Sequence, residues 1–395
     1  MKITCILRRP TPSLLSLFLL AAGGSSATSH ADSLDEALTS GTPSLDMRLR
    51  YEGVDDSVNK NAKAGTLRTR LGYSTGKYYG LSAFGEFEDV RTVAGLNDYA
   101  PIKSGYAVVA DPEVTQLNQA FLSYSVWKNN KLKLGRQRLI LDNARFIGNV
   151  GWRQNEQTFD AVSFVNTSLS NTTITYAYLD KVNGILSKFD ADVSDHLINV
   201  KYEGLKPVKL TAYGYLLEDD DSGATNDTYG LRAKGKTSIS ETSKLLYTAE
   251  FSTQSTNTND AAYSFLEAGM AMQGITVKLG YEVLGSDGGA YGFQTPLATK
   301  HAFNGWADQF LVTPADGLQD MMLTLVGKVK GTKLMAVYHD YSADEGSANY
   351  GSELNLLAAK KFSRRYTLGL KYASYSADTF KTDTDKLWVW AQMKI

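Results

Sequence analysis

The sequence predicts an all-β protein, a transmembrane antiparallel β-barrel of about eighteen strands. Three observations predict this class. Apolar and polar residues alternate with period two along most of the chain, which is typical of strands with one apolar face. The connections between these segments are alternately short and long. Beyond the N-terminus, no stretch approaches the roughly 20 apolar residues that a membrane-spanning helix needs.

The N-terminus has the three parts of a secretory signal peptide, which we place at residues 1–31. A basic start (MKITCILRR) is followed by an apolar run at residues 14–22, and small residues precede a cleavage position after Ala31. The alternative is a membrane anchor, but the run is about half the ~20 residues of a spanning helix. The sequence therefore predicts an exported protein.

The exported chain reads as one barrel domain after a short lead. Residues 32–44 (DSLDEALTSGTPS) are polar and are expected to form a short periplasmic N-terminal segment, and residues 45–395 form the barrel. Each alternating segment is close to the roughly 9–11 residues with which a tilted strand crosses a bilayer. The eighteen expected strands are 45–54, 65–75, 79–90, 117–128, 131–140, 158–168, 172–181, 194–204, 207–218, 227–236, 243–253, 262–273, 275–285, 320–329, 332–341, 351–361, 365–376 and 385–395.

The order of the connections separates a membrane barrel from a soluble exported β-protein. Short connections such as 129–130 and 330–331 alternate with long ones such as 91–116, 141–157 and 286–319. Outer-membrane barrels have short periplasmic turns and long extracellular loops, whereas a soluble sandwich has no reason to place its long loops at one end. The polar face of each strand should then line a wet lumen.

Composition excludes several function classes. Lys+Arg 41 and Asp+Glu 42 give a net charge of −1, whereas nucleic-acid-binding proteins are usually clearly basic. The one cysteine, Cys5, lies in the signal peptide, so we expect no disulfide and no thiol chemistry. His196, His301 and His339 are far apart and match no catalytic or metal-binding pattern. We therefore expect no enzyme, no metal and no cofactor.

Strand parity identifies the side chains expected to face the lumen. Basic residues outnumber acidic ones on that face, which favours anionic solutes. The clearest cluster is four arginines on the first two strands, followed by two glutamates on the third. Guanidinium groups bind carboxylates, so these arginines could bind solute. Ion pairing with the glutamates across strands is the alternative role. The residues expected to line the pore or bind solute are Arg48, Arg50, Arg68, Arg70, Glu86, Glu88, Lys133, Arg136, Arg138, Arg145, Arg153, Asp160 and Arg232.

The loop 141–157 (LDNARFIGNVGWRQNEQ) leaves two readings open. It either folds inward and narrows the pore, or it forms an external lid. Just before it, Arg136 breaks parity and would face lipid, so we expect a bulge or strand end that turns it inward.

Three stretches resemble the alginate-export family of outer-membrane porins. The first runs from 134–137 (LGRQ) into 149–160 (NVGWRQNEQTFD), and the second covers 293–308 (FQTPLATKHAFNGWAD) with the tail 313–318 (TPADGL). The N-terminal LDEALTSG and LDMRLRYE form a weaker third match. The resemblance implies a monomeric eighteen-stranded barrel that passes an anionic polysaccharide through an arginine-lined pore, with long loops as lids.

Together these observations predict an outer-membrane porin for passive diffusion of small hydrophilic, anionic solutes. Export of an alginate-like polysaccharide is the alternative within transport, and a non-conducting surface scaffold or adhesin is the alternative of another class. The expected partners are outer-membrane lipid and lipopolysaccharide, with small anionic solutes or acidic oligosaccharides as cargo and no nucleic acid. We expect a monomer in the bacterial outer membrane.

Overall fold

A computed structural model describes residues 31–125 and 127–395, so all but the last residue of the predicted signal peptide lies outside the described residues. The described elements are α1 (Leu34–Thr39), β1 (Thr42–Asp55), β2 (Ala62–Ser74), β3 (Leu81–Asp98), β4 (Val114–Tyr124), β5 (Asn130–Gln137), β6 (Thr158–Asn166), β7 (Thr172–Asn183), η2 (Ser187–Phe189), β8 (Ala191–Tyr202), β9 (Val208–Glu218), β10 (Thr225–Ser238), β11 (Ser243–Thr256), β12 (Asp260–Met272), β13 (Ile275–Leu284), η3 (Lys300–Ala302), β14 (Leu318–Val329), β15 (Thr332–Ser342), β16 (Asn349–Lys361), β17 (Tyr366–Ala377) and β18 (Thr384–Lys394).

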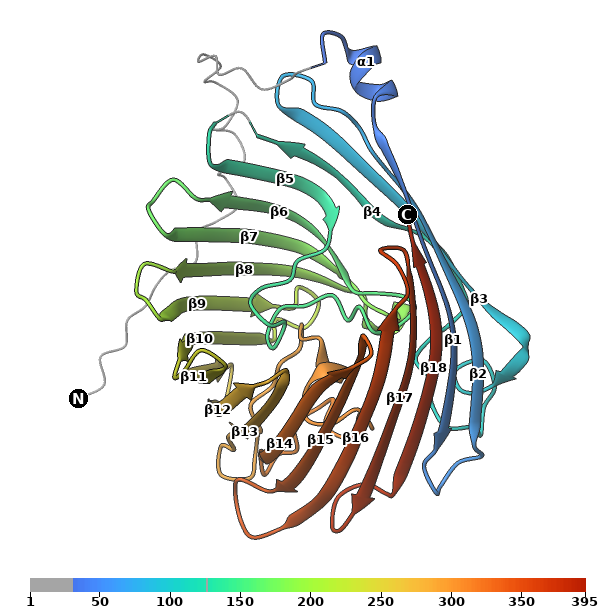
Figure 1. The fold of residues 1–395 in the computed structure, drawn as a ribbon, viewed down its shortest axis with the longest axis vertical. Helices are drawn as coiled ribbons and strands as arrows, with labels where there is room; N and C mark the ends of the chain where they lie inside the picture. The colour runs from blue at the N-terminus through green and yellow to red at the C-terminus, as the bar shows by residue number, and fades with distance from the viewer. Residues whose placement is uncertain (1–30, 126) are drawn as a thin grey trace.

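The eighteen strands form one closed antiparallel barrel. Each strand pairs with the next along the chain, and β18 pairs with β1 to close the ring (Figure 1). At this seam Leu45 and Ile395 exchange two backbone hydrogen bonds, with N···O distances of 3.0 and 2.8 Å. Closure leaves no free edge strand in the sheet, and a bilayer would not tolerate one. The predicted fold class and strand number are confirmed.

Alternation along the strands divides the wall into two faces. On β1 the side chains of Arg48 and Arg50 are buried inside the barrel, while Leu49 between them is exposed on the outside. The same division holds on the far side, where Leu279 and Leu323 point outward. An apolar outer band of this kind is what lipid requires.

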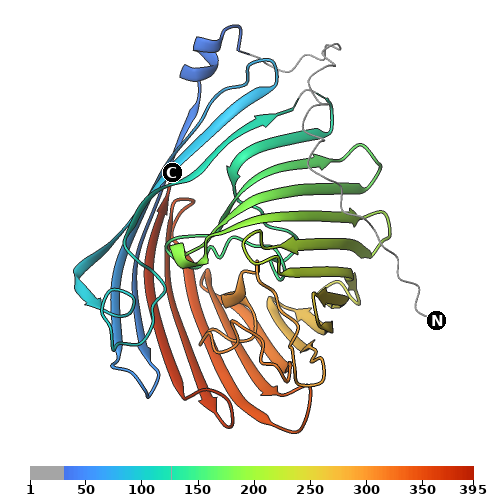
Figure 2. The same ribbon diagram turned by 180° about the vertical axis from the view of Figure 1, so that it is seen from behind.

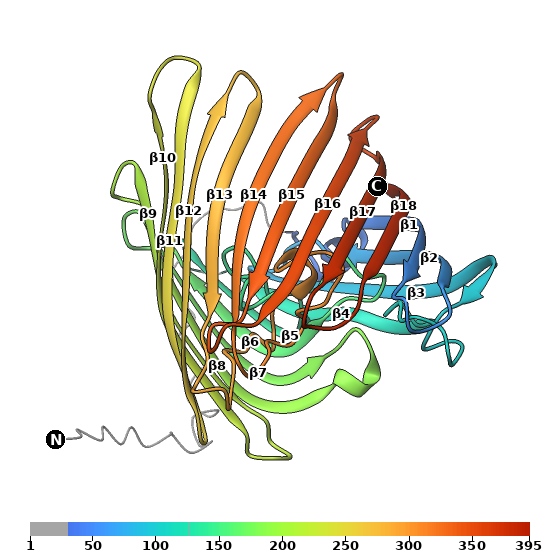
Figure 3. The same cartoon turned by 90° about the horizontal axis from the view of Figure 1, so that it is seen from below.

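Tight turns join the strands at one end of the barrel (Figure 3). Gln273–Gly274 and Lys330–Gly331 are two-residue turns in which both residues have positive φ, between 48° and 83°. Two successive positive φ values are typical of the hairpin turns whose twist matches that of the strands, and glycine adopts them without strain. We call this end of the barrel the turn end and the opposite end the loop end.

The loop end differs in part from the prediction. Only the connections 99–113, 138–157 and 285–317 exceed ten residues, and the expected loop 254–261 shrinks to 257–259. The strands β11 and β12 continue to this point because polar Thr, Ser and Gln residues satisfy the backbone ladder as well as apolar ones do. Period-two hydrophobicity ends at the lipid boundary, whereas strand pairing does not.

Two loops fill much of the barrel interior. The segments after β5 and β13 fold inside the ring of strands (Figure 1), so 138–157 is not an external lid. Phe146 packs against Tyr263 on β12 at 5.4 Å between ring centroids, and Phe310 packs against Tyr341 on β15 at 4.5 Å. The lumen predicted to be polar therefore also contains an apolar core, because aromatic residues on the inward face meet apolar loop residues.

The helix α1 lies beside the turn end of the first strands (Figure 2). The Ser33 hydroxyl accepts a hydrogen bond from Glu36 N at 3.1 Å, and the Glu36 carboxylate accepts one from Asp32 N, so the helix begins with a capping arrangement. The Tyr73 hydroxyl donates to Leu38 O at 2.6 Å and holds the helix to β2. None of the described helices is long and apolar enough to cross a membrane.

Candidate functional site

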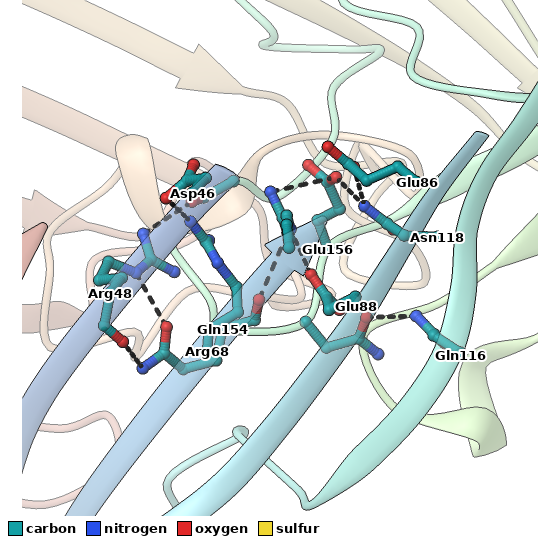
Figure 4. Close-up of polar contacts among 12 residues, drawn as sticks. Asp46, Arg48, Arg68, Glu86, Glu88, Gln116, Asn118, Gln154 and Glu156 are labelled. Atoms are coloured by element: carbon teal, nitrogen blue, oxygen red, sulfur yellow. Dashed lines mark hydrogen bonds and ion pairs between the residues drawn. The ribbon is translucent and has the colours of Figure 1, made fainter. Parts of the chain in front are cut away.

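Four arginines on β1 and β2 meet inside the barrel, as the sequence predicted. Arg48 and Arg68 are direct register partners (Figure 4). Arg50 and Arg70 occupy the next inward positions along β1 and β2, one on either side of this pair. Two adjacent guanidinium groups repel one another, so their burial requires acceptors. Arg68 finds Asp46 at 2.8 Å. Arg48 instead bonds to neutral oxygens of the loop 138–157: Gln154 Oε1 at 2.9 Å, Gly151 O at 3.2 Å and Arg153 O.

A second group of charges continues the wall onto β3 and β4. Arg70 pairs with its register partner Glu88, which confirms the cross-strand ion pairing that was the alternative role for these residues. Arg138 bonds to Glu86 at 2.6 Å and also to Glu156. The Asn118 amide bridges the same two glutamates at 2.8 and 2.7 Å (Figure 4). Glu156 belongs to the inward loop, so the network ties that loop to the wall.

A second tie joins both inward loops to each other and to the seam strands. Arg153 bonds to both oxygens of Glu52 on β1 at 3.0 Å and to Asp308 of the loop 285–317 at 2.9 Å. Asp308 also accepts from Lys386 on β18 at 2.8 Å and from His301 Nδ1 at 2.6 Å. Asp308 thus receives one donor from each loop and one from the barrel wall. We call Asp308 and these three donors the Asp308 hub.

The ring of His301 is fixed on both sides. It stacks on Trp152 with an interplanar angle of 4°, and its Nε2 accepts a hydrogen bond from Lys371 Nζ at 2.7 Å. The Lys371 ammonium also lies 3.8 Å from the Trp306 ring centroid and 4.3 Å from that of Trp152. Ring faces attract a cation that has left water, so the tryptophans compensate for burial of the ammonium.

Burial and charge set the protonation of the loop groups in this hub. Burial, opposed in part by Asp308, lowers the pKa of His301 to about 3, so the ring is neutral at pH 7 and can accept from Lys371. Burial alone would raise the pKa of Asp308, but His301, Lys386 and Arg153 hold it well below its usual range. The carboxylate is therefore charged at any physiological pH.

A third tie holds the loop 285–317 against the opposite wall. Arg145 bonds to Glu282 at 2.8 Å and to Asn304 at 3.0 Å. Glu353 on β16 accepts from the backbone amides of Trp306 and Ala307, the second at 2.8 Å. Gly305 has φ +88°, and a Cβ there would lie 2.2 Å from Glu353 Oε2, so only glycine fits this approach.

The remaining predicted residues divide between the two faces. Arg232 is buried inside the barrel and pairs with Glu250 at 2.9 Å, and Lys133 faces inward with its ammonium 4.3 Å from the Phe121 ring centroid. Arg136 and Asp160 lie on the outer face, because each alternates with buried inward residues of β5 and β6.

The placement of Arg136 and Asp160 corrects the expectation that they line the pore. The irregularities in this region lie on β4, at Asn118, and on β7, between Leu179 and Lys181, while β5 pairs regularly with both of its neighbours. The two side chains form a two-pronged ion pair with distances of 2.8 and 3.0 Å. Mutual neutralisation at the ends of these short strands makes an outward position tolerable for both charges.

Exposed lysines collect on the inward face at the turn end. Lys234, Lys328 and Lys333 are exposed there and make no ion pair in the part of the chain that the structure describes. Others are paired, such as Lys209 with Glu203 and Lys278 with Glu267 at 2.8 Å. Carboxylates on this part of the inner wall are few, so the turn end of the lumen is positively charged.

Sequence reasoning missed the loop residues that organise the interior. Asp308 and His301 were not among the candidates, although both stand in the sequence stretch 293–308 that carries the family resemblance, whereas strand parity already places their partners Lys371 and Lys386 on the inward face. Charged and aromatic residues grouped in a long loop were the available signal. The described residues hold no group of three or more potential metal ligands.

Comparison of the fold with solved structures gives several barrels of the same kind. Acinetobacter baumannii OccAB2 superposes with a TM-score of 0.72 at 13% identity, covering 91% of this chain and 99% of that one. Pseudomonas aeruginosa OpdK, determined with vanillate, has a TM-score of 0.69 at 16% identity with coverage of 91% and 99%. Acinetobacter baumannii OccAB3 has a TM-score of 0.70 at 16% identity, with 91% and 100% covered. No curated protein matches the sequence.

The closed eighteen-stranded barrel with charged interior loops is the architecture of an outer-membrane porin. The sequence model described as "Alginate export" matches residues 44–294. The chain therefore belongs to the alginate export family, which confirms the resemblance seen in the sequence.

Proposed function

We propose that this porin carries small hydrophilic anions by passive diffusion. The observation that carries the proposal is the excess of unpaired positive charge on the inner wall. Lys234, Lys328 and Lys333 face the lumen at the turn end without carboxylate partners among the described residues. Cations lining a narrow aqueous path raise the local concentration of anions and lower that of cations.

Arg48 adds a charge at the level of the inward loops. Its hydrogen bonds go to an amide oxygen and two backbone carbonyls, and it makes no ion pair among residues 31–125 and 127–395. A neutral acceptor satisfies the donors of a guanidinium but does not cancel its charge. Arg50, Arg68 and Arg70 are each neutralised by a carboxylate, so within this cluster Arg48 supplies the uncompensated positive field.

The relatives support a carboxylate as cargo. OpdK was determined with vanillate, an aromatic carboxylate, and shares the barrel architecture of this chain. The proposed solutes are therefore organic acids of this size class. We further propose that the chain acts as a monomer in the bacterial outer membrane, in contact with its lipid and lipopolysaccharide, after cleavage of the signal peptide.

Export of an alginate-like polyanion is the second candidate, and the family match favours it. The inward loops argue for small solutes, because the ties made by Arg153, Arg145 and Glu353 hold both loops across the interior. A polymer would need these ties to open. Uronate oligomers that block the current from the turn end only, and that pass under voltage, would favour the exporter.

The test is the reversal potential of single channels of the refolded protein in a planar bilayer under a KCl gradient. We expect steady conductance with anion-selective reversal, and a shift toward cation selectivity in a Lys234→Gln, Lys328→Gln, Lys333→Gln triple variant. The variant Lys381→Gln, in the loop 378–383, is the matched control. Cation selectivity of the wild type would refute the anionic cargo, and absence of conductance in a folded barrel would favour a surface scaffold.

A further inference from the structure

A cavity of about 660 Å³ lies at the loop end between the loops 99–113, 138–157, 184–190, 219–224 and 285–317. This volume is within the range of small-molecule sites, about 300–1,000 Å³. It is separate from the charge networks along β1–β4, although Arg153, His301 and Asp308 reach its floor.

The walls of the cavity are aliphatic. Its large apolar residues include Val108, Ile185, Leu186, Leu297, Leu311 and Val312. Of these, Val108, Leu311 and Val312 are exposed, with 59%, 42% and 66% of their surface accessible. Phe189 is the one Phe, Tyr or Trp residue in the lining. Exposed aliphatic side chains gathered around a hollow indicate a ligand with an apolar body.

Most charged groups of the lining are already engaged. Arg153 and Asp308 bind each other in the hub, Asp195 accepts from Glu218 N at 2.9 Å, and Asp219 accepts from Ser222 N at 2.8 Å. Two lysines of the lining have no ion pair within the described residues: Lys188 is exposed, with its ammonium 5.0 Å from the Phe189 ring centroid, whereas Lys300 is half-buried and its ammonium makes no hydrogen bond either. Burial, together with the positive charge of Arg145, lowers the pKa of Lys300.

We propose that this cavity binds a monocarboxylate with an aliphatic body, such as a short alkanoate, through Lys300 and the aliphatic wall. Among the cations that line the cavity, Lys300 is the half-buried one without a counter-charge in the described residues, and a carboxylate would neutralise it. The wall offers apolar contact and few free polar groups, so a polyhydroxylated acid of the same charge would lose water without replacement hydrogen bonds. This inference rests on the proposed anion channel and names its preferred substrate class.

The test measures binding directly, by calorimetry of the refolded full chain in detergent with hexanoate as the probe. Gluconate carries the same charge on a hydroxylated six-carbon body, and hexan-1-ol carries the same body without charge. We expect hexanoate to bind at least tenfold more tightly than either. Lys300→Gln should lower the affinity for hexanoate at least tenfold. Leu311→Asn should lower the affinity for hexanoate without raising that for gluconate.

The matched control is Lys381→Gln, which removes a loop lysine outside the cavity and should leave binding unchanged. Equal affinity for hexanoate and gluconate, or undiminished affinity in a folded Lys300→Gln protein, would overturn the assignment. Bilayer recordings separate this result from the channel proposal. Hexanoate binding without anion conduction would refute the channel alone, and anion conduction without hexanoate binding would refute the cavity assignment alone.

Discussion

Replacing Asp308 by asparagine should loosen both inward loops at once. The carboxylate receives Arg153 at 2.9 Å, Lys386 at 2.8 Å and His301 at 2.6 Å, all buried. Removing one partner of a buried charge pair costs about 3–5 kcal/mol, because the other charge stays buried and unpaired. Arg153 keeps Glu52, so we take the lower value of about 3 kcal/mol. At about 1.4 kcal/mol per factor of ten, loop detachment should become roughly 100-fold more frequent.

Single-channel recording is the assay for Asp308→Asn. We expect brief transitions to a larger conductance that are rare in the wild type and common in the variant. The thermal unfolding temperature of the barrel should be the same in both proteins. The double variant Asp308→Asn, Lys386→Gln should lose less free energy of loop docking than the two single variants lose together, because the two residues share one contact. Asp378→Asn, in the loop 378–383, serves as the control. A conductance histogram identical to that of the wild type would refute the idea that the hub holds the loops.

Three further predictions concern charge, pH and loop length. Arg48→Gln should lower anion permeability about fivefold, the effect of roughly 1 kcal/mol from one charge about 4 Å away in water. Because the same charge repels cations, the anion-to-cation permeability ratio should fall by up to about 25-fold, whereas Lys103→Gln should leave it unchanged; reversal potentials measure both. The pKa of His301 is lowered to about 3 in the docked loop, whereas a free histidine has a pKa of about 6.5. Between these two pH values the detached loop binds a proton that the docked loop does not. Docking therefore weakens by about 1.4 kcal/mol per pH unit as the pH falls through that window. Flickering should therefore increase on acidification in the wild type and not in His301→Gln. Shortening the loop 141–157 should raise the mean conductance, and an unchanged conductance would contradict its place across the lumen.

The strands could be predicted because the bilayer imposes a simple pattern on them. One face of each strand meets lipid, so alternation fixes both the strand and its inward residues, as it did for Arg48, Arg68 and Arg232. Parity also placed Arg136 outward, and the expectation of a bulge that turns it inward was wrong because the irregularities are on β4 and β7 and the pairing of β5 is regular. An ion pair with Asp160, 24 residues away, makes the outward position tolerable.

The loop contacts could not be predicted, because no periodicity connects their partners. Arg153 meets Asp308 across 155 residues of sequence, and Arg145 meets Glu282 across 137. Alternation predicts the direction of a side chain on a strand, but it does not predict the position of a residue in a loop. The length and aromatic content of the long loops could be read from the sequence. Which residues join them to each other and to the wall depends on the three-dimensional course of both loops.

The seam between the first and last strands has a consequence for the topology of the chain. Leu45 and Ile395 lie side by side at the turn end, and every other strand neighbours its successor in sequence. The order of strands around the ring is therefore cyclic, and the seam is distinguished only by a missing turn. A circular permutant that joins these two positions by a short linker and opens the Lys330–Gly331 turn should keep all eighteen strand pairs. The inward loops would then be carried on a chain that begins at β15.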